Sequence, residues 1–114
     1  MNYAIRTIAT FDKELKKLAK RYKSLKDDML QLGNELQADP FQGADLGGGV
    51  RKIRLAIASK GKGKKGGARV ITHTEVLLEA HEGTVTMLSI YDKSEQSTIS
   101  EKRIKELLKE AEIK

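Results

Sequence analysis

The residues that could perform chemistry in this sequence are basic and lie in one segment. No acidic residue occurs between Asp45 and Glu75. That interval holds eight cations: Arg51, Lys52, Arg54, Lys60, Lys62, Lys64, Lys65 and Arg69. The rest of the chain carries 14 basic against 16 acidic residues, so the net charge of +6 comes from this segment. A concentrated positive surplus is typical of a phosphate-binding surface, and a solvated basic loop is the alternative.

Other reactive side chains are scarce. The chain has no cysteine, which excludes disulfides, thiolate metal sites and cysteine nucleophiles. His73 and His81 lack the spacing of a metal site. We expect His73 to lie on the surface of a strand and His81 to lie in a turn. Residues 61–66 match G-x-G-x-x-G, but the residues after them predict a strand, whereas a dinucleotide site needs a helix there. We therefore expect no metal and no cofactor.

Lysine, arginine and tyrosine can still act on an RNA phosphodiester. RNA carries its own nucleophile, the 2′-hydroxyl, so a protein need only align it, move two protons and neutralise the charge that develops on the phosphate. Neighbouring positive charges disfavour the charged form of a lysine, which suits a general base. Lys52 lies beside Arg51 and shares a strand face with Arg54. Phosphate binding alone is the alternative role for Lys52 and Arg54.

The first part of the chain predicts a strand and a helical hairpin. Alternation over residues 2–9 indicates the strand, and the apolar spacing over residues 11–22 indicates an amphipathic helix. Lysines occupy the other positions of this helix: Lys13, Lys16, Lys17 and Lys20. Ser24 is a typical N-cap for a second helix, which ends at Asp39-Pro40. The apolar stripe of the second helix is Leu25, Met29, Leu32 and Leu36.

The second part predicts three strands and a last helix. A loop at residues 41–49 precedes a strand at residues 50–58, and a flexible connection at residues 59–67 follows. Two β-branched strands then meet at a short turn around His81, which completes an antiparallel meander. Thr98 to Glu101 fits a capping box for the last helix.

We therefore expect an α+β fold in a single domain over residues 1–114. The expected antiparallel sheet contains the N-terminal strand plus the three-strand meander, and it packs against the helical hairpin and the C-terminal helix.

Three segments resemble the RelE/HigB-type toxins of bacterial toxin–antitoxin modules. They are residues 48–54 (GGVRKIR), residues 61–71 (GKGKKGGARVI) and residues 91–96 (YDKSEQ) before the last helix. The likeness covers nearly the whole chain in element order, and the glycine- and lysine-rich hairpin resembles the HigB-like branch. The resemblance implies a RelE-like fold. It also implies a ribosome-dependent endoribonuclease that cuts mRNA without metal and leaves 2′,3′-cyclic phosphate and 5′-hydroxyl ends.

The resemblance also implies site residues. Lys52 and Arg54 match two basic residues on the strand that faces the RNA, and Lys52 matches a proposed base. Arg69 matches an arginine that clamps the scissile phosphate, and Lys93 matches a basic residue that stabilises charge or acts as an acid. RelE-type members carry a tyrosine shortly afterwards, whereas residues 95–100 contain none. Tyr91 is either its substitute, a base-stacking residue or a tyrosine at the edge of the core.

The expected partners follow from charge and resemblance together. Further RNA-phosphate contacts are expected from Arg51, Lys60, Lys62, Lys64 and Lys65. The resemblance implies binding to mRNA and the ribosome, and inhibition by a cognate antitoxin, which we expect to be a small helix-turn-helix protein encoded adjacently. No signal peptide or membrane span is recognisable, so we expect a cytoplasmic protein. Alternatives are a non-catalytic RNA- or ribosome-binding module on the same scaffold and, with less support, a DNA-binding regulator.

Overall fold

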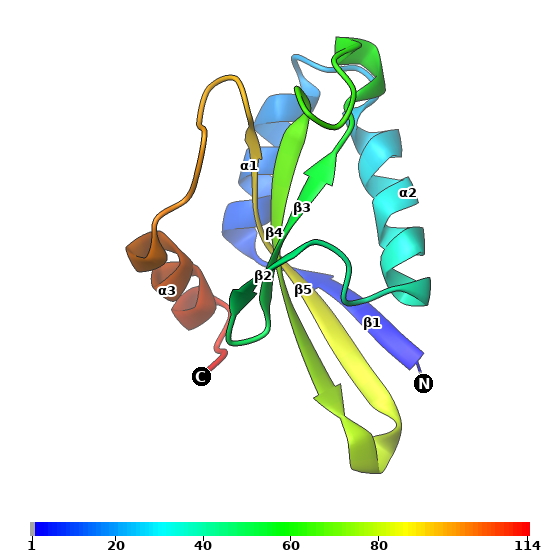
Figure 1. Cartoon of the computed structure of the whole chain (residues 1–114), viewed down its shortest axis with the longest axis vertical. Helices are drawn as coiled ribbons and strands as arrows, with labels where there is room; N and C mark the ends of the chain where they lie inside the picture. Colours follow the sequence, from blue (N-terminus) through cyan, green and yellow to red (C-terminus); the bar gives the residue numbers. More distant parts are fainter. Residues whose placement is uncertain (1) are drawn as a thin grey trace.

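The computed structural model describes residues 2–114 and confirms an α+β fold built on a five-stranded sheet (Figure 1). The strands lie in the order β1-β5-β4-β3-β2. The elements are β1 (Asn2–Thr7), α1 (Ala9–Ala19), α2 (Leu25–Ala38), β2 (Ala44–Gly47), β3 (Val50–Leu55), β4 (Ala68–Leu77), β5 (Glu82–Asp92) and α3 (Glu101–Glu110), with 3-10 turns η1 (Ala58–Lys60) and η2 (Leu78–Ala80). The predicted helical hairpin, the antiparallel meander β3-β4-β5 and the C-terminal helix are all present.

The sheet differs from the prediction in two respects. β1 pairs with β5 in parallel, with Ile5 opposite Val85, so the sheet is mixed and not wholly antiparallel. No hairpin joins these two strands, and their relative direction is set by the path of the chain across the sheet. Residues 41–49, expected to be a loop, contain β2, which pairs with β3. The connecting glycines Gly47, Gly48 and Gly49 have φ values of 92°, 61° and 84°, which allows this tight turn.

The helical hairpin covers one face of the sheet. The whole predicted stripe of α2 is buried: Leu25, Met29, Leu32 and Leu36. Phe11 and Leu18 of α1 are also buried. On the sheet, Ile53, Val70 and Ile90 lie in one row across β3, β4 and β5, and all three are buried. Burial of these apolar side chains is the main force that fixes both helices on this face.

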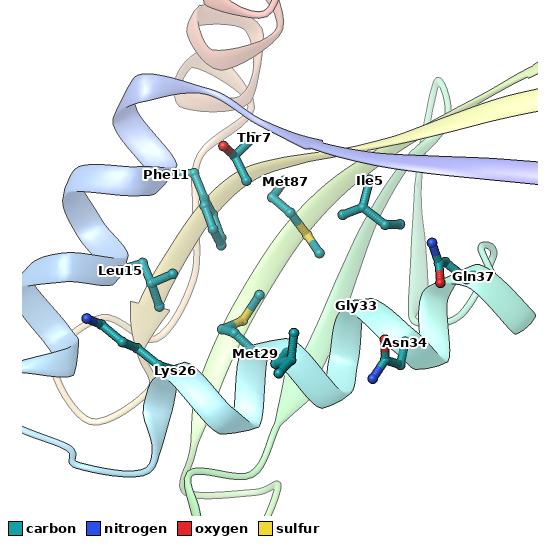
Figure 2. A pocket seen from close by; sticks show the side chains of 11 residues that line it. Ile5, Thr7, Phe11, Leu15, Lys26, Met29, Gly33, Asn34, Gln37 and Met87 are labelled. Atoms are coloured by element: carbon teal, nitrogen blue, oxygen red, sulfur yellow. The ribbon is translucent and has the colours of Figure 1, made fainter.

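An apolar pocket of about 370 Å³ remains between β1, α1 and α2. Figure 2 shows Ile5, Phe11 and Met29 around it, with Met87 of β5 between Phe11 and Ile5. Gly33 of α2 also lines the pocket, and a Cβ atom added there would meet nothing within 4 Å. The hairpin is therefore less tightly packed at this end.

The C-terminal helix packs on the opposite face. α3 buries Leu107, and Ala111, which follows the helix, is also buried. The Arg6 guanidinium donates to the Ala111 carbonyl at 3.2 Å. The Glu110 carboxylate accepts from the Thr10 backbone N–H at 3.1 Å, which joins α3 to the start of α1.

Both predicted helix caps differ in detail. The cap of α3 is Ser100, whose Oγ accepts from the Arg103 N–H at 3.1 Å, so the prediction of a capping box from Thr98 was wrong. Ser24 does precede α2, but its backbone is already helical (φ −83°, ψ −9°), and its side chain makes no capping hydrogen bond. Its hydroxyl donates instead to the Asp28 carboxylate at 2.7 Å.

The structure confirms the predicted position of His81 but not that of His73. His81 lies in the β4–β5 turn with φ +54°, as predicted. His73 is only 8% exposed, so the prediction of a surface residue was wrong. A Cβ atom added at Gly49 would lie 3.0 Å from its Nε2 atom, which shows how closely the β2–β3 turn covers it. Burial lowers the pKa of His73, and this histidine is therefore a packed neutral residue.

Candidate nucleic-acid interface

Three of the predicted site residues form a row across the sheet. Arg54 of β3 lies opposite Arg69 of β4, and Arg69 lies opposite Tyr91 of β5. Directly opposed residues of antiparallel strands share a face, so these three side chains lie on one face of the sheet. The adjacent row of Ile53, Val70 and Ile90 points to the other face, while the two ends of the charged row reach the helices at the edges of the sheet: Arg54 lines a cavity with Leu32 of α2, and Tyr91 lines another with Leu18 of α1. Residues distant in sequence are thus brought together.

Lys52 and Lys93 lie beside this row. Lys52 is two residues from Arg54 on the same strand, so it points to the same face, and it is partly buried whereas Arg54 is exposed. Lys93 follows the end of β5, and its backbone N–H donates to the Gly67 carbonyl at 3.1 Å. All five predicted catalytic residues therefore lie on or next to one region of the β3-β4-β5 meander.

Arg69 fixes the lysine-rich loop at residues 61–67. It is 4% exposed, and its guanidinium donates to the carbonyls of Lys64 at 3.0 Å and Lys65 at 3.1 Å. A third bond, of 3.1 Å, reaches the Ala68 carbonyl. The prediction of a flexible connection was therefore wrong, because a buried cation holds the loop backbone. The side chains of Lys62, Lys64 and Lys65 remain exposed.

Tyr91 is 5% exposed, and its hydroxyl has no hydrogen-bond partner among residues 2–114. Burial raises the pKa of Tyr91, and the positive charge of Arg69 partly opposes that effect. The ring is part of the core, so the core-edge interpretation fits its position. The unpaired hydroxyl next to Arg69 is the polar feature that this interpretation leaves unexplained.

The most highly connected polar side chain near the loop is Asp92, which the sequence analysis did not single out. Its side chain is fully buried and pairs with the Lys60 ammonium at 2.7 Å. The carboxylate also accepts from the Tyr22 hydroxyl at 2.5 Å, the Ser94 N–H at 2.9 Å and the Ser94 hydroxyl at 2.7 Å. Burial alone would raise the pKa of Asp92, but the bonds from Lys60, Tyr22 and Ser94 outweigh burial and hold this pKa well below its usual range.

Asp92 thus joins the end of α1, the start of the lysine loop and the segment after β5. A sequence signal for part of this cluster does exist. Aspartate two residues before serine at the end of a strand favours a turn in which the carboxylate accepts from the backbone N–H two residues on. The partners Tyr22 and Lys60 are distant in sequence and gave no such signal.

Two predicted RNA-binding residues are occupied elsewhere. Lys60 has a side chain only 13% exposed, because its ammonium pairs with Asp92. Arg51 lies on the hairpin side of the sheet, where its guanidinium stacks over the Phe41 ring at 5.3 Å and donates to the Phe41 carbonyl at 3.2 Å. Adjacent residues of a strand point to opposite faces, so Arg51 points away from the face that Lys52 shares with Arg54. The exposed or partly exposed cations on and beside the candidate face and loop are therefore Lys52, Arg54, Lys62, Lys64, Lys65 and Lys93.

The chain is a small α+β protein whose mixed sheet carries a cationic row beside an ordered lysine-rich loop. The family model described as the RelE toxin of the RelE/RelB toxin–antitoxin system matches residues 8–113. The chain therefore belongs to the RelE toxin family. Both matches are to RelE, and the HigB-like branch of the family stays a prediction.

A solved structure has the same fold. It is the E. coli toxin RelE, as a double arginine-to-alanine mutant in the free state. It is 17% identical in sequence, with a TM-score of 0.58, and the match covers 96% of this chain and 97% of that chain. At this level of identity the likeness concerns the fold alone.

Residues 2–114 contain no cluster of three histidine, aspartate or glutamate side chains that could hold a metal ion. No helix within these residues is long and apolar enough to cross a membrane.

Proposed function

We propose that this protein is a toxin that cuts mRNA on the ribosome, with the reaction centred on the β3-β4-β5 face. The observation that carries the proposal is the row formed by Arg54, Arg69 and Tyr91, with Lys52 beside it, in a member of the RelE toxin family. Cations gathered on one face are suited to stabilise the charge that a phosphodiester gains during transesterification.

The proposed reaction uses the 2′-hydroxyl of the RNA as the nucleophile. Lys52 acts as the base that accepts the hydroxyl proton while the 2′-oxygen bonds to phosphorus. The bond between phosphorus and the 5′-oxygen breaks, and the Lys93 ammonium protonates that oxygen. The products are a 2′,3′-cyclic phosphate and a 5′-hydroxyl, and no metal takes part. Arg54 neutralises the non-bridging oxygens of the phosphate throughout.

Arg69 has a conditional role in this proposal. Its guanidinium is bonded to the carbonyls of Lys64 and Lys65, so it must exchange those acceptors for the phosphate in order to clamp it. A charge-assisted bond to a phosphate is stronger than a bond to a neutral carbonyl, which favours the exchange when RNA is bound. Tyr91 is adjacent and would then contact either the phosphate or a base.

In this proposal, the loop at residues 61–67 binds RNA but takes no part in the chemistry. Lys62, Lys64 and Lys65 are exposed on an ordered backbone and contact RNA phosphates. We further propose that the protein acts in the cytoplasm and is neutralised by a cognate antitoxin, a small helix-turn-helix protein encoded next to it.

The test is to map mRNA ends in a translating extract. Wild-type protein is expected to produce fragments with 5′-hydroxyl ends, and Lys52→Ala is expected to abolish them. Lys102→Ala, which removes an exposed lysine from α3, is the matched control and should cut normally. Intact mRNA with wild-type protein, or normal cutting by Lys52→Ala, would overturn the proposal.

Three observations favour the second candidate, a ribosome-binding module without catalysis. Arg69 is saturated by carbonyls, Tyr91 is buried, and residues 95–100 contain no tyrosine. This candidate predicts ribosome binding with intact mRNA, so the same extract experiment separates it from the toxin.

A further inference from the structure

A cavity of about 250 Å³ lies beside the candidate site, where the outer edge of β3 is uncovered. Within residues 2–114, β2 pairs with β3 only over Val50 to Lys52, so the end of β3 has no strand on its outer side. α2 lies alongside this part of the sheet (Figure 1). The lining of the cavity includes Gln31, Leu32, Glu35, Arg54, Leu55 and Lys64, and we call it the β3-edge pocket.

The β3-edge pocket has apolar walls. Leu32 and Leu55 line it and are buried, and Ala56 adds a third apolar surface. Its volume is below that of sites for drug-sized ligands and suits one flat ring system. Proteins read single-stranded RNA through unstacked bases that are held against side chains and hydrogen-bonded at their edges. A single nucleobase therefore fits the size and the walls of this pocket.

Two side chains of α2 bring unused hydrogen-bonding groups to the pocket. Gln31 and Glu35 are four residues apart, so they lie on one side of the helix. Neither takes part in the ion pairs or side-chain hydrogen bonds found within residues 2–114. Asp28, the other acidic residue of the lining, has a structural role instead, because its carboxylate accepts from the Ser24 hydroxyl at 2.7 Å and the Ala58 N–H at 3.1 Å.

Two cations line the same pocket as Glu35. Arg54 and Lys64 are both exposed, and neither belongs to an ion pair within the described chain. The cations attract phosphate, whereas a carboxylate repels it and needs a hydrogen-bond donor. A nucleotide satisfies both, with its phosphate on the cations and its base at the carboxylate.

The chemistry of these groups favours guanine among the four RNA bases. A carboxylate only accepts hydrogen bonds, and it does so through two oxygens. The Watson–Crick edge of guanine presents two adjacent donors, N1–H and the N2 amino group, with the O6 acceptor beside them. The Glu35 carboxylate can accept from both donors while the Gln31 amide donates to O6. Adenine, cytosine and uracil lack this pair of adjacent donors and would set an acceptor against the carboxylate.

We propose that the β3-edge pocket binds a guanine base of the mRNA next to the scissile phosphate, and that Glu35 determines this specificity. The inference rests on the proposed function, because cleavage at the charged row brings a neighbouring nucleotide to Arg54. Lys64 joins the two regions, since its carbonyl accepts from Arg69 and its side chain lines the pocket.

The test measures binding of the purified protein to short uridine oligonucleotides with a single central guanosine, inosine or adenosine. All sugars are 2′-O-methylated, which removes the nucleophile and prevents cleavage. Fluorescence anisotropy should show that wild-type protein binds the guanosine oligonucleotide about tenfold more tightly than the adenosine one. Inosine lacks the N2 amino group of guanine, so its oligonucleotide should bind with intermediate affinity.

Glu35→Gln should change the base that is preferred. A glutamine amide offers one acceptor and one donor, which match the N6 amino group and N1 of adenine. The ratio of guanosine to adenosine affinity should therefore fall at least about tenfold. Glu35 is exposed, so the fold should survive, which a thermal melt checks. Asp27→Asn, at an exposed aspartate of the same helix outside the pocket, is the matched control and should keep the preference for guanosine.

Three results would overturn the inference. The first is equal affinity of wild-type protein for the guanosine and adenosine oligonucleotides, or binding to neither. The second is an unchanged preference in Glu35→Gln. The third is an equal loss of preference in Asp27→Asn, which would make the effect one of overall charge.

mRNA cleavage in a translating extract separates this inference from the proposed function. Guanosine selectivity in the oligonucleotide assay, combined with intact mRNA in the extract, would overturn the proposed function alone. Cut mRNA without guanosine selectivity, and with the same cut positions for wild type and Glu35→Gln, would overturn this inference alone.

Discussion

Asp92 illustrates how single residues set what the cations of this protein can do. Its carboxylate forms an ion pair with Lys60, which the sequence predicted as an RNA contact. Arg51, also predicted as an RNA contact, stacks instead on the Phe41 ring. Strand alternation was sufficient to predict that Lys52 and Arg54 share a face. Which cations stay free was not predictable, because their partners come from distant segments.

Asp92→Asn is expected to destabilise the protein by about 3 kcal/mol, because it leaves the Lys60 ammonium without its carboxylate in a largely buried site. Urea denaturation at neutral pH measures this change. Asp45→Asn, at an exposed aspartate, is the control and should change stability by less than about 1 kcal/mol. Equal effects of the two substitutions would contradict the account.

The stability contributed by Asp92 should also depend on pH. The pKa of this carboxyl is lowered in the folded state, so its contribution is fully present above the pKa of the unfolded chain, about 4, and is lost as pH falls toward the folded value. The difference in unfolding free energy between wild type and Asp92→Asn should therefore shrink below about pH 4. A constant difference down to pH 2 would contradict this assignment.

Arg69→Lys is expected to loosen the loop, because an ammonium cannot reproduce the planar guanidinium that reaches the Lys64 and Lys65 carbonyls. Loss of these charge-assisted bonds costs about 2 kcal/mol, so trypsin should cut within residues 61–67 more than about tenfold faster. Arg54→Lys, at an exposed arginine, should leave the cutting rate unchanged. The account fails if both variants are cut like wild type.

At the scale of elements, local periodicity predicted the helices and the meander, because each depends on spacing within one segment. The stripe of α2 from Leu25 to Leu36 is buried as predicted. The parallel pairing of β1 and the strand β2 depend on neighbours far away in sequence, and periodicity did not predict them. The ordering of the lysine loop by Arg69 escaped prediction for the same reason.

Gly33→Ala is expected to stabilise the protein by about 1 kcal/mol. The position lies inside α2, where glycine is a poor helix former, and the added methyl group would enter the open pocket shown in Figure 2. Thermal or urea unfolding measures the gain. Gly67→Ala is the opposite control, since its Cβ would lie 2.0 Å from the Leu55 carbonyl oxygen, and it should destabilise the protein. A loss of stability in Gly33→Ala would contradict the described packing.

At the scale of the whole molecule, the candidate site and the lysine loop are adjacent, because Arg69 of the row bonds to the carbonyls of Lys64 and Lys65. The net charge of +6 indicated phosphate binding from sequence alone, but only the fold shows that Lys60 is paired with Asp92 and that Arg51 is stacked on Phe41.

Substitution of the loop lysines should affect binding more than chemistry. A variant with glutamine at Lys62, Lys64 and Lys65 should bind programmed ribosomes with a salt slope shallower by about two. Its cleavage rate at saturating protein should stay within about threefold of wild type, because these residues only contact phosphates. A large fall in the saturated rate would place the loop in the reaction itself.

The most direct measurement is single-turnover cleavage of ribosome-bound mRNA at saturating protein, with the fragment ends identified. The account predicts 5′-hydroxyl ends with wild-type protein, and a rate at least about 100-fold lower for Lys52→Ala, which should still bind the ribosome. Intact mRNA with wild-type protein, or an undiminished rate with Lys52→Ala, would contradict the assignment of mRNA cleavage to the β3-β4-β5 face.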